Sequence, residues 1–398
     1  MTAVAPYPTD PCERAFSAGH VTPDETVLTE LCAELFSSLA RSDQRRKGEI
    51  YVRGLLTAQG RKSIRKLASL SGGRVDEQSL HHFVCSSTWD WTAVREALAH
   101  YIAQAVPVRA WVVRPMVTPK AGEHSVGVDR SFSADAGHVL NAQQAVGVWA
   151  ASDELTCPVN WRLHLPAAWT EDSARRSRAA IPDDVDVETF GDCAVAAYLQ
   201  MAEAWNLPVR PVVMDARRSD ALSAIRRLKA SGLPMVIRVG GAQPLVPACD
   251  VLPGHRNEPV PAERIMSALR ERRRPVFDPD TGVVTSLTAV VPVRLPVTGA
   301  GRELSLLAEW ETNRPAPIAL WLTDLTTTDP ATLIRLSRHL RQVDDDFARI
   351  SDQVGIRDYS GRSFDGWHRH VTLASAAHAA ASFGGETVSR ELSYRVAG

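Results

Sequence analysis

One run of the chain, residues 210–241, constrains the fold more than any other. It reads RPVVMDARRSDALSAIRRLKASGLPMVIRVGG, with an apolar stretch, an amphipathic stretch and a second apolar stretch. This pattern predicts a strand, a helix and a strand. Strands joined through a helix form a parallel crossover unit. We therefore expect an α/β fold in which functional side chains stand at the carboxyl ends of parallel strands.

The stretches before this unit predict a different architecture. Residues 1–22 contain three prolines and little periodicity, which indicates a flexible tail. Residues 23–106 repeat apolar side chains at three- and four-residue spacing, which predicts a helical domain ending at Pro107. Strands are then expected at 109–113, 124–132 and 140–153, with residues 115–123 as a hairpin loop between the first two.

The later stretches complete the predicted organisation. Residues 242–300 are rich in proline and valine and predict a largely β insertion. Strands within 302–310 and 316–325 follow, then helices over 331–355 and from about Phe364. The α/β core is thus expected in two parts, 107–241 and 301–385, followed by a C-terminal tail at 386–398.

Composition narrows the class of protein. The chain of 398 residues is 44% hydrophobic and 23% charged, with a formal net charge of −1, so nucleic-acid binding would require local basic patches. No run approaches the roughly 20 apolar residues of a membrane helix, and no secretory pattern opens the chain. The six cysteines form no CxxC pair, so we expect free thiols and a cytoplasmic protein without a zinc site.

Seven short motifs occur in an order that resembles the DDE-type transposases of the insertion sequence 701 family. They are YVRGLL with GRKSI, DEQSLHHFV with TWDW, PKAGEHSVGV, ASDELTCPVNWRLHLPAAW, VVMDA, LLAEW with LWLTDL, and GRSFDGWHRHVTL. The resemblance covers roughly residues 45–380. It implies a ribonuclease-H-like core and a two-metal site in which three carboxylates hold Mg²⁺ for DNA strand transfer.

The carboxylates that this resemblance implies are only partly present. The strand within WVVRP should deliver the first aspartate, but Arg114 and Pro115 stand there, and a cation repels a metal ion. Asp215 occupies the second position. Counting back from Gly355 places Asp344 at the third, where the family has glutamate. We therefore expect a degenerate triad, with Asp215 and Asp344 as its remnants and no certain metal.

Changes around the expected site point the same way. Arg217 and Arg218 follow Asp215 where the family has small residues. Leu340 and Ser351 stand where related transposases have arginine and lysine. Together with Arg114, the two arginines could bind an anion through bidentate contacts, or acids could neutralise them.

Several observations keep other interpretations open. Asp215 could instead cap the helix that follows, and Asp344–Asp346 could be a solvated acidic face. Glu123 or Asp129 could replace the missing carboxylate. His368 and His370 lack the spacing and carboxylate of a helical metal site, which favours a packing role.

The strongest signal for nucleic acid is a basic run near the N-terminus. Arg61, Lys62, Arg65 and Lys66 could form a plain solvated face, or could contact the DNA backbone as the resemblance implies, with Lys62, Arg65 and Lys66 on one helical face.

Three functions follow from these observations. The leading one is a transposase-like protein impaired in strand transfer that acts by binding DNA, as a regulator or domesticated scaffold. The second is an enzyme that reuses the site for an anionic small molecule, with Asp215 or Asp344 as acid or base. The third is an active transposase with substitute metal ligands.

Overall fold

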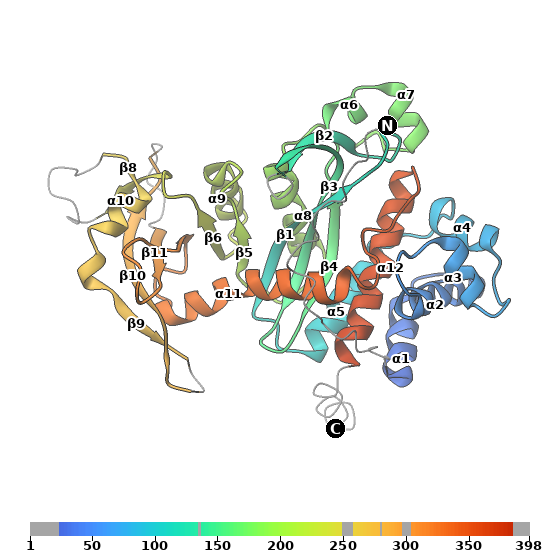
Figure 1. Cartoon of the computed structure of the whole chain (residues 1–398), viewed down its shortest axis with the longest axis horizontal. Coiled ribbons are helices and arrows are strands. Elements are labelled where there is room, and N and C mark those ends of the chain that lie inside the picture. The colour runs from blue at the N-terminus through green and yellow to red at the C-terminus, as the bar shows by residue number, and fades with distance from the viewer. Residues whose placement is uncertain (1–23, 134–136, 249–257, 279–280, 297–303, 385–398) are drawn as a thin grey trace, which may run out of the picture.

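A computed structural model describes residues 24–133, 137–248, 258–278, 281–296 and 304–384 (Figure 1). The tails predicted at 1–22 and 386–398 lie outside these residues. The first elements are five helices: α1 (Glu25–Leu35), α2 (Ser42–Thr57), α3 (Ile64–Leu70), α4 (Glu77–Cys85) and α5 (Trp91–Ala105). Local sequence explains where four of them begin, because side chains of Asp24, Ser63, Asp76 and Asp90 accept hydrogen bonds from the first turns.

The strands of the described residues form one twelve-stranded mixed sheet. Its main path is β2-β3-β1-β5-β6-β12-β11-β10-β7-β8, with β4 paired to β3 and β9 to β10. The strands of the first half are β1 (Ala110–Pro119), β2 (Val128–Ser133), β3 (His138–Ala151), β4 (Thr156–Leu163), β5 (Val212–Asp215) and β6 (Met235–Val239). The second half contains β7 (Pro244–Pro247), β8 (Val260–Pro261), β9 (Arg274–Phe277), β10 (Val284–Arg294), β11 (Leu304–Trp310) and β12 (Ala319–Thr323).

The predicted crossover unit is confirmed. β5 leads through α9 (Ala221–Ala230) into β6, and the two strands pair in parallel from Val212 opposite Met235 to Asp215 opposite Arg238. β1 lies against the other side of β5, also in parallel, and pairs with β3 in the antiparallel direction. The five strands β4-β3-β1-β5-β6 therefore combine antiparallel strands with a parallel crossover.

The predicted hairpin between the first two strands is wrong. β1 does not pair with β2; it continues through Pro115 to Pro119 and pairs with β3 throughout its length. Trp111 N donates toward β5, to Pro211 O, so alternate residues such as Pro115 direct their nitrogens to the same side. Because β5 has ended at Asp215, no partner there requires the missing N–H. The other edge of β3 pairs with β2 and β4, and β4 was not predicted as a strand.

The described residues of the segment 242–300 contain the strands β7 to β10, with α10 (Ala262–Ser267) and a short 3-10 turn (Arg270–Arg272) between β8 and β9. Its longest strand, β10, pairs with β11 from Leu287 opposite Trp310 to Val293 opposite Leu304. The segment therefore extends the central sheet.

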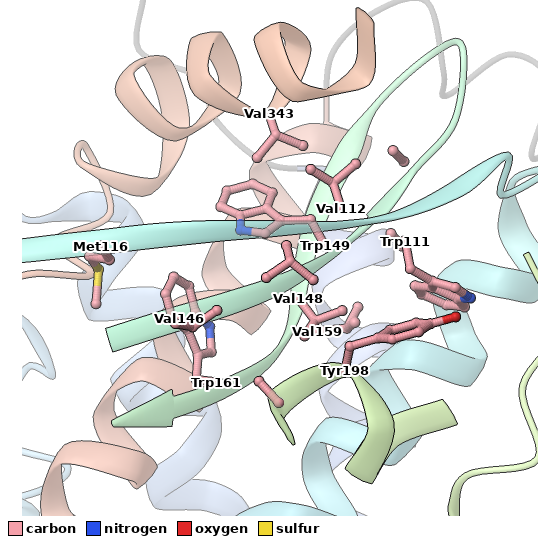
Figure 2. Close-up of a cluster of buried hydrophobic side chains, with 14 of the residues drawn as sticks. Trp111, Val112, Met116, Val146, Val148, Trp149, Val159, Trp161, Tyr198 and Val343 are labelled. Carbon is pink, nitrogen blue, oxygen red and sulfur yellow. The ribbon is translucent and has the colours of Figure 1, made fainter. Parts of the chain in front are cut away.

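Helices cover both faces of the sheet (Figure 1). The long helix α11 (Pro330–Asp346) crosses one face and contacts β1, β3, β4, β5 and β6, then continues into a π-helical turn (Phe347–Ser351). α8 (Phe190–Ala204) covers the opposite face against β1, β3 and β4. Figure 2 shows the resulting core, with Val343 of α11 near Trp149 on one side and Tyr198 of α8 beside Trp111 on the other. The short helices α6 (Ala167–Thr170) and α7 (Ser173–Ala179) precede α8.

The last helix, α12 (Phe364–Phe383), lies between the N-terminal helices and the sheet. It contacts β4 as well as α1, α2, α4 and α5, and most of its residues are buried. His368 and His370 face this interior: His368 Nδ1 accepts from Arg95 Nη2, and His370 bonds with Tyr51 Oη and Gly355 O. These histidines have packing roles in the structure.

Candidate functional site

The two predicted site positions at the strand ends lie side by side. β1 and β5 run in parallel with Val113 opposite Met214, so the next residues, Arg114 and Asp215, follow at the same level. Asp215 is the last residue of β5. The fold therefore brings Arg114 to the position next to Asp215.

Asp215 is held by Arg217 on both of its oxygens. Arg217 Nε lies 3.0 Å from Oδ1 and from Oδ2, and its Nη2 lies 2.7 Å from Oδ2. Arg217 N also donates to Oδ1 over 3.0 Å, and Arg238 Nη1 of β6 lies 3.8 Å from Oδ2. Burial acts to raise the pKa of Asp215, but the hydrogen bonds from Arg217 outweigh it and lower this pKa. The helix that follows is capped by Asp220 and not by Asp215.

Arg114 is held by one carboxylate oxygen and one aromatic ring. Its Nε donates to Asp344 Oδ1 of α11 over 2.7 Å, and its guanidinium lies 3.7 Å from the centre of the Phe347 ring. The Arg114 side chain is only 19% exposed. Burial lowers the pKa of Arg114 and the contact with Asp344 opposes that shift. The contact fixes the guanidinium over the strand ends.

The three acids of the triplet have separate environments. Asp344 is 63% exposed and contacts Arg114. Asp345 lies on the outer surface, 3.9 Å from Arg341. Asp346 is buried, where it accepts from Thr156 N and Oγ1 over 3.2 and 2.8 Å. Only Asp344 therefore faces the strand ends, whereas Asp346 fixes α11 to β4.

The positions expected to carry arginine and lysine have apolar or internal surroundings. Leu340 packs against the core. Ser351 is fully buried and its Oγ lies 2.9 Å from His378 Nδ1.

The residues at this site do not fit a catalytic metal pair. β1 has no acidic residue, both oxygens of Asp215 are engaged by Arg217, and Asp344 is engaged by Arg114. Within the described ranges, no three His, Cys, Asp or Glu residues lie together as a metal-binding group. Asp129 lies opposite Ala142, which lies opposite Pro119, so Asp129 is level with the far end of β1.

The predicted basic residues of the N-terminal region have different settings. Arg61 and Arg65 are exposed and make no hydrogen bond or ion pair with another described residue. Lys66 Nζ donates to Gln59 O. The prediction that Lys62 shares a helical face with Arg65 and Lys66 is wrong, because α3 begins at Ile64. Lys62 is 6% exposed, and its Nζ donates to Ala58 O.

Several contributors to the site were not predicted. Phe347 lies beneath Arg114, and Arg357 also lies near the Phe347 ring, 5.4 Å from its centre. In the sequence, Arg238 is a single cation within the apolar strand MVIRV. Its position opposite Asp215 depends on the pairing of β5 with β6, which the sequence does not show.

The predicted site residue Arg218 is exposed and has no hydrogen-bond or ion-pair partner among the described residues.

Comparison with known proteins places the chain in a family. The model of a family described as "DDE superfamily endonuclease" matches residues 34–279, which include Arg114 and Asp215. The chain belongs to this DDE superfamily endonuclease family. Membership implies a ribonuclease-H-like fold, which agrees with the strands β4-β3-β1-β5-β6, and a nucleic-acid substrate. No curated protein matches the chain. Among the described residues, no helix is both long and apolar enough to cross a membrane.

Proposed function

We propose that this protein is a transposase-like member of the family, of the insertion sequence 701 type, with a degenerate catalytic triad. In this proposal it no longer performs metal-dependent strand transfer and acts by binding DNA, as a regulator or a domesticated scaffold. The observation that carries the proposal is the Arg114 guanidinium beside Asp215, bonded to Asp344. It stands where the resemblance implies the first carboxylate.

Electrostatics supports this proposal. A divalent ion 4 Å from a guanidinium is repelled by about 8 kcal/mol at an effective dielectric constant of about 20. A metal would also have to displace Arg217 from Asp215, although these groups form a bidentate charge-assisted contact. Both remaining acids would therefore have to leave their arginine partners before they could bind a metal.

DNA binding is proposed for the helical region, residues 23–106. Arg61 and Arg65 carry this role best because they are exposed and make no hydrogen bond or ion pair with described residues. Lys66 adds a charge beside them. Residues 107–241 and 301–385 would form the ribonuclease-H-like core, with 242–300 as its β-rich insertion.

Two other functions receive less support. The second function would require Arg114, Arg217 and Arg218 to bind an anion. Arg114 is paired with Asp344 and Arg217 with Asp215, so Arg218 alone of the three would be available for the anion. Metal-dependent activity through substitute ligands would need Glu123 or Asp129, and Asp129 is level with the far end of β1.

The proposal is tested by measuring cleavage and binding of duplex DNA by the same protein. We expect no cleavage above background with Mg²⁺ or Mn²⁺, and duplex binding whose affinity falls steeply with salt. Asp215→Asn should leave binding unchanged. Metal-dependent cleavage that disappears in Asp215→Asn would overturn the proposal, and so would an absence of duplex binding at low salt.

A further inference from the structure

A second cluster of cations surrounds a pocket away from the strand ends. The pocket has a volume of about 110 Å³ and is lined by Glu123, His124, Trp169, Arg175, Arg178, Ala179 and Arg362. Three guanidinium groups therefore face one carboxylate. The lining comes from three distant segments: the loop between β1 and β2, the helices α6 and α7, and the loop before α12.

The arginines of α7 are divided between two tasks. Arg176 donates to the carbonyl oxygens of Thr170, Pro182 and Val185, and so holds the chain that follows α7. Arg175 and Arg178, three residues apart, both line the pocket. The carboxylate of Asp172 caps α7 and lies 3.8 Å from Arg175 Nε.

The wall beneath these arginines is rigid. Trp169 is 4% exposed, and its Nε1 donates to Val128 O over 2.9 Å, which joins α6 to β2. The Arg175 guanidinium lies over the Trp169 ring, 5.5 Å from its centre. A cation held against an aromatic face is oriented without losing its charge.

The other two arginines retain their hydrogen-bonding capacity. Arg178 and Arg362 are exposed, and within the described parts of the chain neither makes a hydrogen bond or an ion pair with another residue. Glu123 lines the same pocket but lies in no ion pair with described residues. Guanidinium groups that converge in this way match the oxygens of a phosphate.

We propose that this pocket is a phosphate-binding site formed by Arg175, Arg178 and Arg362. The volume is well below the roughly 300 Å³ of pockets for drug-sized ligands, so it suits one phosphate group and not a whole nucleotide. The phosphate is either inorganic phosphate or one phosphate of a DNA backbone. The site does not depend on residues of α3, so it can exist even if these do not bind DNA.

The first arm of the test uses inorganic phosphate. We expect phosphate to raise the melting temperature of the full chain above that in chloride at the same ionic strength. Arg178→Gln with Arg362→Gln should remove most of this rise, because it removes two of the three donors. Arg226→Gln, at an exposed position on α9, is the matched control and should retain the rise. Glu123→Gln should strengthen phosphate binding by removing the opposing charge.

The second arm uses a short duplex and separates the two sources. If the phosphate belongs to DNA, Arg178→Gln with Arg362→Gln should weaken duplex binding and reduce the salt slope by roughly 2. If only inorganic phosphate binds, duplex affinity stays unchanged while the thermal effect is lost. The site is overturned if phosphate stabilises no more than chloride and the double variant binds duplex like the wild type. If Arg65→Gln loses duplex binding while the double variant keeps it, the result supports the proposed DNA-binding role of Arg65 and says nothing of this pocket.

Discussion

Arg114 Nε and Asp344 Oδ1 lie 2.7 Å apart and join the middle of β1 to α11, at the level where β5 ends. A second pair, Arg217 with Asp215, closes the neighbouring position. Asp215 and Asp344 are therefore each paired with an arginine, and the place where the family resemblance implies a metal site holds a network of ion pairs.

Removing both arginines should recreate affinity for a divalent ion. The double substitution Arg114→Asp and Arg217→Gly would place three carboxylates near the end of β5 and would leave Arg238, 3.8 Å from Asp215, as the cation beside them. We expect Mn²⁺ to raise the melting temperature of this variant, by an amount that corresponds to about 2.7 kcal/mol when the ion is at 100 times its Kd. The matched control, Arg114→Ala with Arg217→Gly, should show no such rise. Equal stabilisation of the wild type by Mn²⁺ would contradict this prediction.

Arg95, a buried residue of α5, should be essential for stability. It is 3% exposed and donates to Thr372 Oγ1, Asn160 Oδ1 and Trp161 O, over 2.7, 3.2 and 2.7 Å. Arg95→Leu would leave these acceptors without a donor, at about 1–3 kcal/mol each. We expect a loss of at least about 3 kcal/mol in urea unfolding.

Arg109→Leu serves as the comparison for Arg95→Leu. Arg109 is 55% exposed and pairs with Asp153 at the surface, so its loss should cost less than about 1 kcal/mol. Similar unfolding curves for both variants would show that the buried contacts contribute little.

Stability should decrease as the pH falls below neutrality. Burial lowers the pKa of His370 and of His378 from 6.5 to about 4. Since the unfolded chain binds these protons near pH 6.5 and the folded chain only near pH 4, stability is full above pH 6.5 and falls between these values. Between pH 7.5 and pH 5 the loss is roughly 2 kcal/mol for each histidine, because pH 5 lies about 1.5 units below the pKa of the unfolded chain. Urea unfolding at pH 7.5 and pH 5 measures it.

His370→Gln should flatten this dependence because glutamine does not titrate. The carboxylates with lowered pKa, such as Asp215, lose their contribution only at lower pH. A wild-type stability that is unchanged from pH 7.5 to pH 5 would contradict the assignment.

Two neighbouring cations should respond differently to neutralisation. Arg65→Gln should weaken duplex binding and reduce the salt slope by roughly 0.9, with little change in stability. Lys62→Gln should instead destabilise the fold, because the Lys62 side chain is buried and its Nζ donates to Ala58 O. Thermal unfolding and a salt titration of binding separate the effects. A Lys62→Gln protein with wild-type stability but weakened duplex binding would contradict the structural role of Lys62 and assign it to DNA binding instead.

Local patterns predicted those parts of the fold that depend on short segments. The strand, helix and strand over 210–241 were readable because each element has its own periodicity and Asp220 caps the helix. The partner of β1 was not readable, since strand pairing depends on contacts distant in sequence. Pro115 suggested a loop, but only the end of β5 at Asp215 shows why a strand accepts a proline there.

The candidate site was predictable only in part for the same reason. Arg114, Asp215, Arg217 and Asp344 could be named from their places in motifs. The pairing of Arg217 with Asp215 and of Arg114 with Asp344 depends on rotamers and helix position. The basic run of residues 61–66 looked uniform in sequence, yet one of its cations is internal, because the helix begins two residues after it.

The placement of α12 has a consequence for folding during synthesis. The ribosome makes α1 to α5 first and α12 only after every described strand of the sheet, yet α12 packs on α1, α2, α4 and α5. The apolar faces of α1, α2, α4 and α5 that pack on α12 therefore stay exposed to solvent until α12 has been synthesised. Nascent chains of this protein are expected to need shielding by chaperones throughout most of their synthesis.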